Sequence, residues 1–176
     1  GRLNSYSEYF QKSYDEYFQF PWAGIGDIRG QQDTSQYEQY HPNLKKGGVI
    51  DLWGVAHEPG SEAAKHMTYM RCPLKGIDSF AEVKAYPLPD FAAGDASHQK
   101  VQAESIRARG LAVMGGMQCT IWETAWYIRG MEDLMMDMMS DDPIAAYLLD
   151  AVTERSVIRA QSYARAGADL LYLGDD

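Results

Sequence analysis

The chain has little cysteine, a shortage of positive charge and no long apolar run, and each absence excludes a class of protein. Its two cysteines, Cys72 and Cys119, lie far apart, which argues against a disulfide scaffold and favours reduced thiols. The 16 Lys and Arg residues are outnumbered by 25 Asp and Glu residues, and the net charge of −9 opposes binding to nucleic acid and to anionic membranes. No apolar run approaches the roughly 20 residues that a membrane-spanning helix needs. We therefore expect a cytoplasmic protein with neither nucleic acid nor a membrane as partner.

The N-terminal part is rich in tyrosine and poor in aliphatic residues. Gly1 to Asn4 lack an initiator methionine and the apolar stretch of a signal peptide, so we expect the natural N-terminus to lie upstream. Aromatic residues between Tyr6 and Phe20 recur at helical spacing and predict an amphipathic helix, which would pack on the rest of the protein or on a second copy in a homodimer. The chain thus divides into a Tyr-rich helical and loop segment, 1–46, and a globular part, 47–176.

Polar residues follow three apolar, strand-like runs in the globular part. They are Asp51 after 47–50, Gln118 after 111–114, and Asp175 and Asp176 after 169–173. In α/β enzymes the carboxyl ends of buried parallel strands carry the chemistry. A closed (β/α)₈ barrel usually needs about 250 residues. We therefore predict an α/β fold, a TIM (β/α)₈ barrel that is incomplete in this chain.

Helical periodicity and end signals place helices at 97–108, 120–130, 131–139 and 143–166, and 67–73 is predicted as part of a hairpin. Ser79 to Glu82 and Thr120 to Glu123 have the form of capping boxes. The methionine stripe of 131–139 is predicted to fill the core. Because the order is strand, helices, strand, the last two strands should be parallel neighbours joined by a right-handed crossover.

Several of these runs resemble the uroporphyrinogen decarboxylase superfamily. The resemblance covers about 47–176 and is carried by the order and spacing of 50–55, 66–68, 86–90, 116–132, 134–137 and 167–176. It points to the decarboxylase-like branch that is linked with corrinoid methyltransferases. The resemblance implies a barrel of which this chain holds roughly the first half.

The resemblance also implies site residues. Asp51 falls where the decarboxylases keep a carboxylate that holds the pyrrole N–H groups of a tetrapyrrole, although it would equally cap the turn after its strand. Glu123 is equally a helix cap, and Arg129 equally a surface salt-bridge partner. The predicted catalytic residues are Asp51, Asp175, Asp176 and Tyr127. The predicted substrate-binding residues are Trp53, His57, Met117, Gln118, Glu123, Trp126 and Arg129.

Three functions stay open. The first is methyl transfer between a corrinoid protein and a thiol acceptor. The second is decarboxylation of a tetrapyrrole such as uroporphyrinogen, for which Arg29, Arg71 and Arg129 would have to bind the substrate carboxylates. The third is a non-catalytic half-barrel that binds a partner. The methyltransferase branch binds zinc through a His-x-Cys and a distant Cys, which the resemblance places in the second half of the barrel. We therefore predict no metal or cofactor site within this chain, and zinc only if a C-terminal half carries those ligands.

Overall fold

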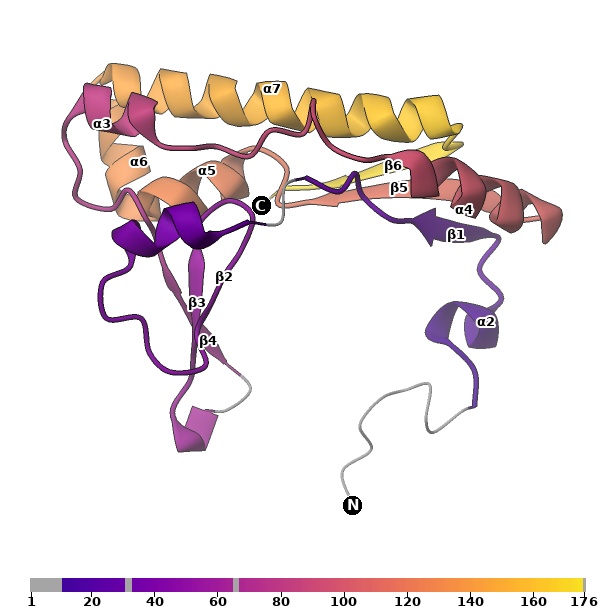
Figure 1. Cartoon of the computed structure of the whole chain (residues 1–176). Helices are drawn as coiled ribbons and strands as arrows, with labels where there is room; N and C mark the ends of the chain where they lie inside the picture. Colours follow the sequence, from indigo (N-terminus) through magenta and orange to yellow (C-terminus); the bar gives the residue numbers. More distant parts are fainter. Residues whose placement is uncertain (1–10, 31–32, 65–66, 176) are drawn as a thin grey trace.

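The computed structural model describes residues 11–30, 33–64 and 67–175, which form two three-stranded sheets with helices packed around them (Figure 1). One sheet is parallel, in the order β1 (Trp22–Ile25), β5 (Ala112–Gln118), β6 (Leu170–Gly174). The other is antiparallel, in the order β2 (Val49–Ile50), β3 (Ala56–Pro59), β4 (Thr68–Arg71). The α-helices are α2 (Tyr14–Phe18), α3 (Phe80–Ala85), α4 (Ser97–Ala108), α5 (Trp122–Arg129), α6 (Met131–Met139) and α7 (Pro143–Ala166), with 3₁₀ turns η1 (Ser35–Tyr40) and η2 (Glu62–Ala64).

This topology corrects the predicted TIM barrel. The strands of the described residues belong to two separate sheets, and the parallel sheet has three strands and open edges. Val49 and Ile50, predicted to be a barrel strand ahead of Asp51, pair antiparallel with β3 instead. A short apolar run before an aspartate is compatible with either kind of sheet, because periodicity does not reveal the pairing partner. The predicted half-barrel fold is therefore wrong.

The crossover between the last two strands is confirmed. β5 and β6 are parallel neighbours, in register from Met114 opposite Leu170 to Gln118 opposite Gly174, and α5, α6 and α7 connect them. The bounds of α4, α6 and α7 also agree with those predicted. The Asp142 side chain accepts a hydrogen bond from the Ile144 amide (2.9 Å) at the start of α7, and Gly167 ends the helix with φ of 85°.

Two apolar clusters form the core, and α7 contributes to both. The larger cluster joins α3, α5, α6 and α7 to the antiparallel sheet, with Leu74, Ile128, Leu134 and Leu148 almost fully buried. The smaller lies between α4, the parallel sheet and the second half of α7, which runs along the molecule in Figure 1. Burial of these side chains is the main stabilising contribution to such a fold.

Two apolar segments are more exposed than predicted. β6 lies at the edge of its sheet, and its residues 170–173 are 42 to 57% exposed, although a buried strand was expected. The methionines of α6 lie mostly at the surface, Met139 being 80% exposed, whereas Leu134 of that helix is buried. The prediction of a methionine-filled core is therefore wrong. Among the described residues, no helix has the length and apolar character to cross a membrane.

Candidate functional site

The ends of β5 and β6 are bonded together where the chain enters α5. The Thr120 amide donates a hydrogen bond to the Gly174 carbonyl oxygen (3.2 Å), and the Thr120 hydroxyl donates to the Met117 carbonyl oxygen (2.8 Å). Cys119, the residue before Thr120, has φ of 53°, a left-handed conformation that is uncommon outside glycine. Such strain persists only where surrounding contacts hold it and is frequent at functional sites.

Asp175 caps α5 from the end of β6. Its Oδ2 accepts hydrogen bonds from the amides of Ile121 (3.1 Å) and Trp122 (2.8 Å), and its Oδ1 accepts from the amide of Glu123 (2.8 Å). These amides are unpaired within the helix, and the helix dipole favours a carboxylate there. The predicted capping box is therefore wrong, because the Thr120 hydroxyl bonds elsewhere. Asp175 positions α5 against the sheet.

Three side chains beside this cap form a chain of hydrogen bonds. The Cys119 thiol donates to the Tyr127 hydroxyl oxygen (3.6 Å), and the Tyr127 hydroxyl donates to Glu123 Oε1 (2.9 Å). Burial raises the pKa of the Tyr127 hydroxyl, and the hydrogen bonds with Cys119 and Glu123 raise it further. Burial also raises the pKa of the Cys119 thiol. Both groups are therefore protonated at neutral pH. The two hydrogen bonds connect the Cys119 thiol, through the Tyr127 hydroxyl, to the Glu123 side chain.

Sequence reasoning named Glu123 and Tyr127 but missed Cys119 as a site residue. The spacing held the signal, since Cys119, Glu123 and Tyr127 follow one another at intervals of four residues. Residues four apart lie on one face of a helix, and Cys119 stands just before the first turn of α5.

Arg129 and Met117 lie inside the molecule. Arg129 is 2% exposed and donates to Asp137 through Nε (2.7 Å) and to the Leu74 carbonyl oxygen through Nη1 (2.8 Å). Hydrogen bonding to Asp137 raises the pKa of Arg129. Of the two alternatives for Arg129, the structure favours the salt bridge, although the pair is buried and not at the surface as predicted. Met117, 1% exposed, belongs to the smaller core cluster.

Trp126 packs against Tyr127, whereas Gln118 lies at the surface. The Trp126 ring meets the Tyr127 ring edge to face, with 4.2 Å between centroids. Its buried Nε1 has no hydrogen-bond partner within the described part of the chain. Gln118 is exposed at the end of β5. These placements leave Gln118 accessible and make Trp126 a wall of the site.

Asp51 and His57 form a separate pair at the antiparallel sheet. Asp51 Oδ1 accepts from the amides of Trp53 (2.9 Å) and Val55 (3.0 Å), and Asp51 Oδ2 lies 2.9 Å from His57 Nε2. The Tyr86 hydroxyl donates to the Trp53 carbonyl oxygen (2.6 Å), which holds the same turn. The structure thus favours the turn-capping alternative for Asp51.

Asp176, which was predicted to be catalytic, lies outside the described residues. In the described ranges, no group of three or more His, Cys, Asp and Glu side chains is arranged to hold a metal ion. We therefore derive no step through zinc from the residues of this chain.

Fold and site together define an α/β protein with a small open parallel sheet and a thiol, a phenol and a carboxylate at its strand ends. Comparison of the chain with protein-family models, with curated proteins and with solved structures finds no match.

Proposed function

We propose that this chain belongs to an enzyme of the uroporphyrinogen decarboxylase superfamily that transfers a methyl group from a corrinoid protein to a thiol acceptor. The family assignment rests on the sequence resemblance. The observation that carries the chemistry is the direction of the hydrogen bonds from the Cys119 thiol through Tyr127 to Glu123.

Methylation of a thiol requires that its proton leave, because the thiolate is the nucleophile. An acceptor thiol placed against Tyr127, as the Cys119 sulfur is now, passes its proton to the Tyr127 oxygen while the Tyr127 proton moves to Glu123. The sulfur then bonds the methyl carbon as the bond from that carbon to the corrinoid metal breaks and leaves its electron pair on the metal. The corrinoid supplies the methyl group, and Glu123 holds the proton.

Decarboxylation of a tetrapyrrole is the second candidate. A Tyr127 hydroxyl that stays protonated would suit it, because the carbon that loses CO₂ must gain a proton. However, two of the three arginines that would have to bind the substrate carboxylates have internal partners. Arg129 pairs with Asp137, and Arg71 pairs with Glu58 at 3.0 Å. Because Arg71 and Arg129 are already paired with acidic side chains, we favour methyl transfer over decarboxylation.

The test is thiol methylation with free methylcobalamin and 2-mercaptoethanol, followed by mass spectrometry of the methylated thiol and by loss of the methylcobalamin absorbance. Glu123→Gln and Tyr127→Phe should each lower the rate by about 10²-fold, the lower range for loss of a general base.

Glu132→Gln is the matched control, because Glu132 is an exposed glutamate of α6. It should leave the rate unchanged. A rate equal to that without protein, or equal rates for Glu123→Gln and the unchanged protein, would contradict methyl transfer. Release of CO₂ from uroporphyrinogen would support the second candidate instead.

A further inference from the structure

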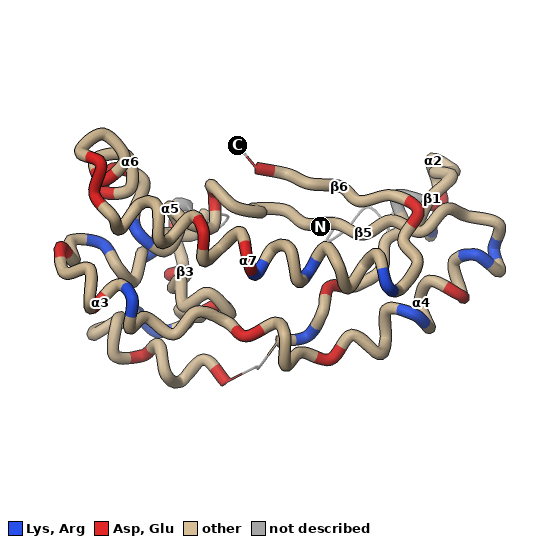
Figure 2. Tube along the Cα trace, turned by 90° about the horizontal axis from the view of Figure 1, so that it is seen from above, with Lys and Arg blue, Asp and Glu red and all other residues tan. Residues whose placement is uncertain are grey.

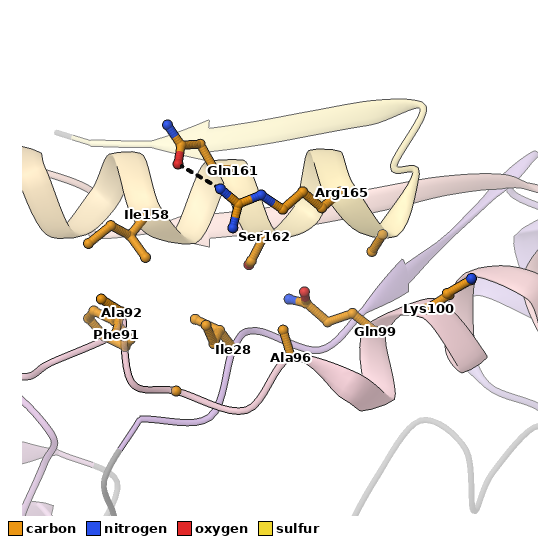
Figure 3. A pocket seen from close by; sticks show the side chains of 12 residues that line it. Ile28, Phe91, Ala92, Ala96, Gln99, Lys100, Ile158, Gln161, Ser162 and Arg165 are labelled. Carbon is orange, nitrogen blue, oxygen red and sulfur yellow. Dashed lines mark hydrogen bonds between the residues drawn. The ribbon is translucent and has the colours of Figure 1, made fainter.

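A pocket of about 430 Å³ lies between α7 and the segment that leads into α4. Small-molecule sites usually measure roughly 300 to 1,000 Å³. None of the residues Cys119, Glu123 and Tyr127 lines it. Figure 3 shows its two walls, formed by Ile158, Gln161, Ser162 and Arg165 of α7 and by Phe91, Ala92, Ala96, Gln99 and Lys100 of the opposite segment. The pocket is thus distinct from the site at the strand ends.

Gln99 is a wall residue whose hydrogen bonding is incomplete. The side chain is 0% exposed, and its Nε2 donates to the Gly26 carbonyl oxygen (3.0 Å). This bond fixes the orientation of the amide, because a flipped amide would set oxygen against oxygen. Its Oε1 is then a buried acceptor that no donor reaches among the residues that the structure describes. Buried acceptors without a donor are rare and costly, so a ligand donor at this position would complete the site.

The pocket has apolar side chains at one end and cationic groups both at the other end and along the α7 wall. In Figure 3, Ile158 and Phe91 lie at one end and Lys100 at the other, with Gln99 and Ser162 between them. Arg165 extends along α7, where its Nη2 donates to Gln161 Oε1 (3.5 Å). Although the chain carries a net charge of −9, none of the 12 lining residues is acidic. Figure 2 shows that Lys and Arg residues alternate with Asp and Glu residues along α4 and α7, so the excess of positive charge belongs to the lining itself. The pocket therefore favours an anion with an apolar part.

We propose that this pocket binds a small organic carboxylate that has an apolar body and one N–H or O–H donor. The carboxylate pairs with Arg165, whose guanidinium group lies beside Gln161 and Ser162 in Figure 3, and Lys100 adds positive charge at the far end of the pocket. The apolar body packs against Ile28, Phe91 and Ile158, and the donor bonds Gln99 Oε1. Binding here does not depend on the function proposed for the strand ends.

The test is an NMR titration of the whole chain with indole-3-acetate, which has all three features. Its Kd should be on the order of 1 mM, as expected for a ligand of this size. Shifts should concentrate on the Gln99 side-chain amide and on the methyl groups of Ile28 and Ile158. Naphthalene-1-acetate lacks only the N–H group and should bind about tenfold more weakly, since it leaves Gln99 Oε1 unpaired. Indole-3-ethanol lacks only the carboxylate and should lose a similar factor.

The double variant Lys100→Gln with Arg165→Gln should weaken indole-3-acetate by about tenfold or more. These two side chains are exposed, so the variant should fold normally. The matched control is Lys46→Gln with Lys84→Gln, two exposed lysines outside the pocket, and it should bind as the unchanged protein does. The proposal would be overturned if no binding is detected at a ligand concentration of about ten times the expected Kd, or if the shifts fall on residues outside the pocket. It would also be overturned if the indole and naphthalene acids have equal Kd values, or if the pocket variant binds indole-3-acetate as tightly as the unchanged protein does.

Discussion

Gly115 shows how one residue determines the packing of the parallel sheet. A Cβ atom at this position would lie 2.6 Å from the Tyr163 ring, so α7 approaches β5 closely only because the side chain is absent. The Tyr163 hydroxyl then donates to the Gly116 carbonyl oxygen (3.0 Å), which holds the ring over the strand. A Cβ atom at Gly116 would meet no described atom within 4 Å, so there is room for a side chain at Gly116 but not at Gly115.

Gly115→Ala should therefore lower the free energy of unfolding by about 1–3 kcal/mol, the usual cost of overpacking a tight core. Gly116→Ala is the matched control and should change it by less than about 0.5 kcal/mol. Urea unfolding followed by circular dichroism measures both values. Equal stability of the two variants would show that Tyr163 moves aside without cost.

At the scale of elements, α5 depends on a cap that is distant in sequence. Asp175 reaches α5 from the end of β6, whereas α7 is capped locally by Asp142. This cap of α5 is therefore complete only when β6 lies beside β5. This arrangement also sets Glu123 and Tyr127 beside Cys119 at the strand ends.

Asp175→Ala should lower the free energy of unfolding by about 1 kcal/mol, as the loss of a helix cap does. It should also speed hydrogen exchange at the amides of Ile121, Trp122 and Glu123, because these donate to Asp175. Asp142→Ala is the companion variant and should affect only the first turn of α7. Unchanged exchange at 121–123 in Asp175→Ala would refute the cap.

At the scale of the whole molecule, Asp169 ties the parallel sheet to α4. Its Oδ2 accepts from the Val113 amide (2.8 Å), and its Oδ1 lies 3.4 Å from Arg107 Nη2. The hydrogen bond from Val113 lowers the pKa of Asp169, with a further contribution from Arg107. The folded state therefore favours the carboxylate. This contribution to stability is present above the usual aspartate pKa and is lost as the pH falls through the lowered value.

Asp169→Asn should accordingly be less stable than the unchanged protein at pH 7 and should lose less of its stability between about pH 5 and pH 2. Thermal unfolding across this pH range measures both effects. Asp150→Asn, at an exposed position of α7, is the control and should keep the slope of the unchanged protein. An identical acid slope for Asp169→Asn would disprove the coupling.

The open edge of the parallel sheet affects how whole molecules associate with one another. β6 pairs with β5 on one side, and Leu171 and Leu173 are 42% and 57% exposed. Exposed apolar edge strands promote association, and a lysine on the edge opposes it. Leu171→Lys should therefore lower the weight-average mass measured by sedimentation at high protein concentration. Val157→Lys, at a residue of α7 that is 47% exposed, should leave that mass unchanged. Equal masses for both variants would contradict association through the edge.

The sequence predicted local features well and the sheet arrangement poorly. The helix of 97–108, the Asp142 cap and the hairpin at β4 follow from signals within a few residues. The antiparallel pairing of Val49 and Ile50 does not, because periodicity does not identify the partner of a strand, and the exposure of β6 depends on which elements pack against it. In the candidate site, the sequence indicated Glu123 and Tyr127, while the structure added Cys119 and assigned Asp51 and Arg129 to internal bonds.

By itself, the sequence determined the helices at 97–108, 131–139 and 143–166, the Asp142 cap, the acidic net charge and the spacing of Cys119, Glu123 and Tyr127, because helical hydrogen bonds and side-chain periodicity are local. Only the tertiary structure decided which strands pair, that α5 is capped by Asp175, and that Gln99 faces a pocket between α4 and α7. The parallel pairing, the Asp175 cap and the Gln99 contact join residues separated by roughly 50 to 90 positions, and contacts at such separations form only when the whole chain buries its apolar surface together.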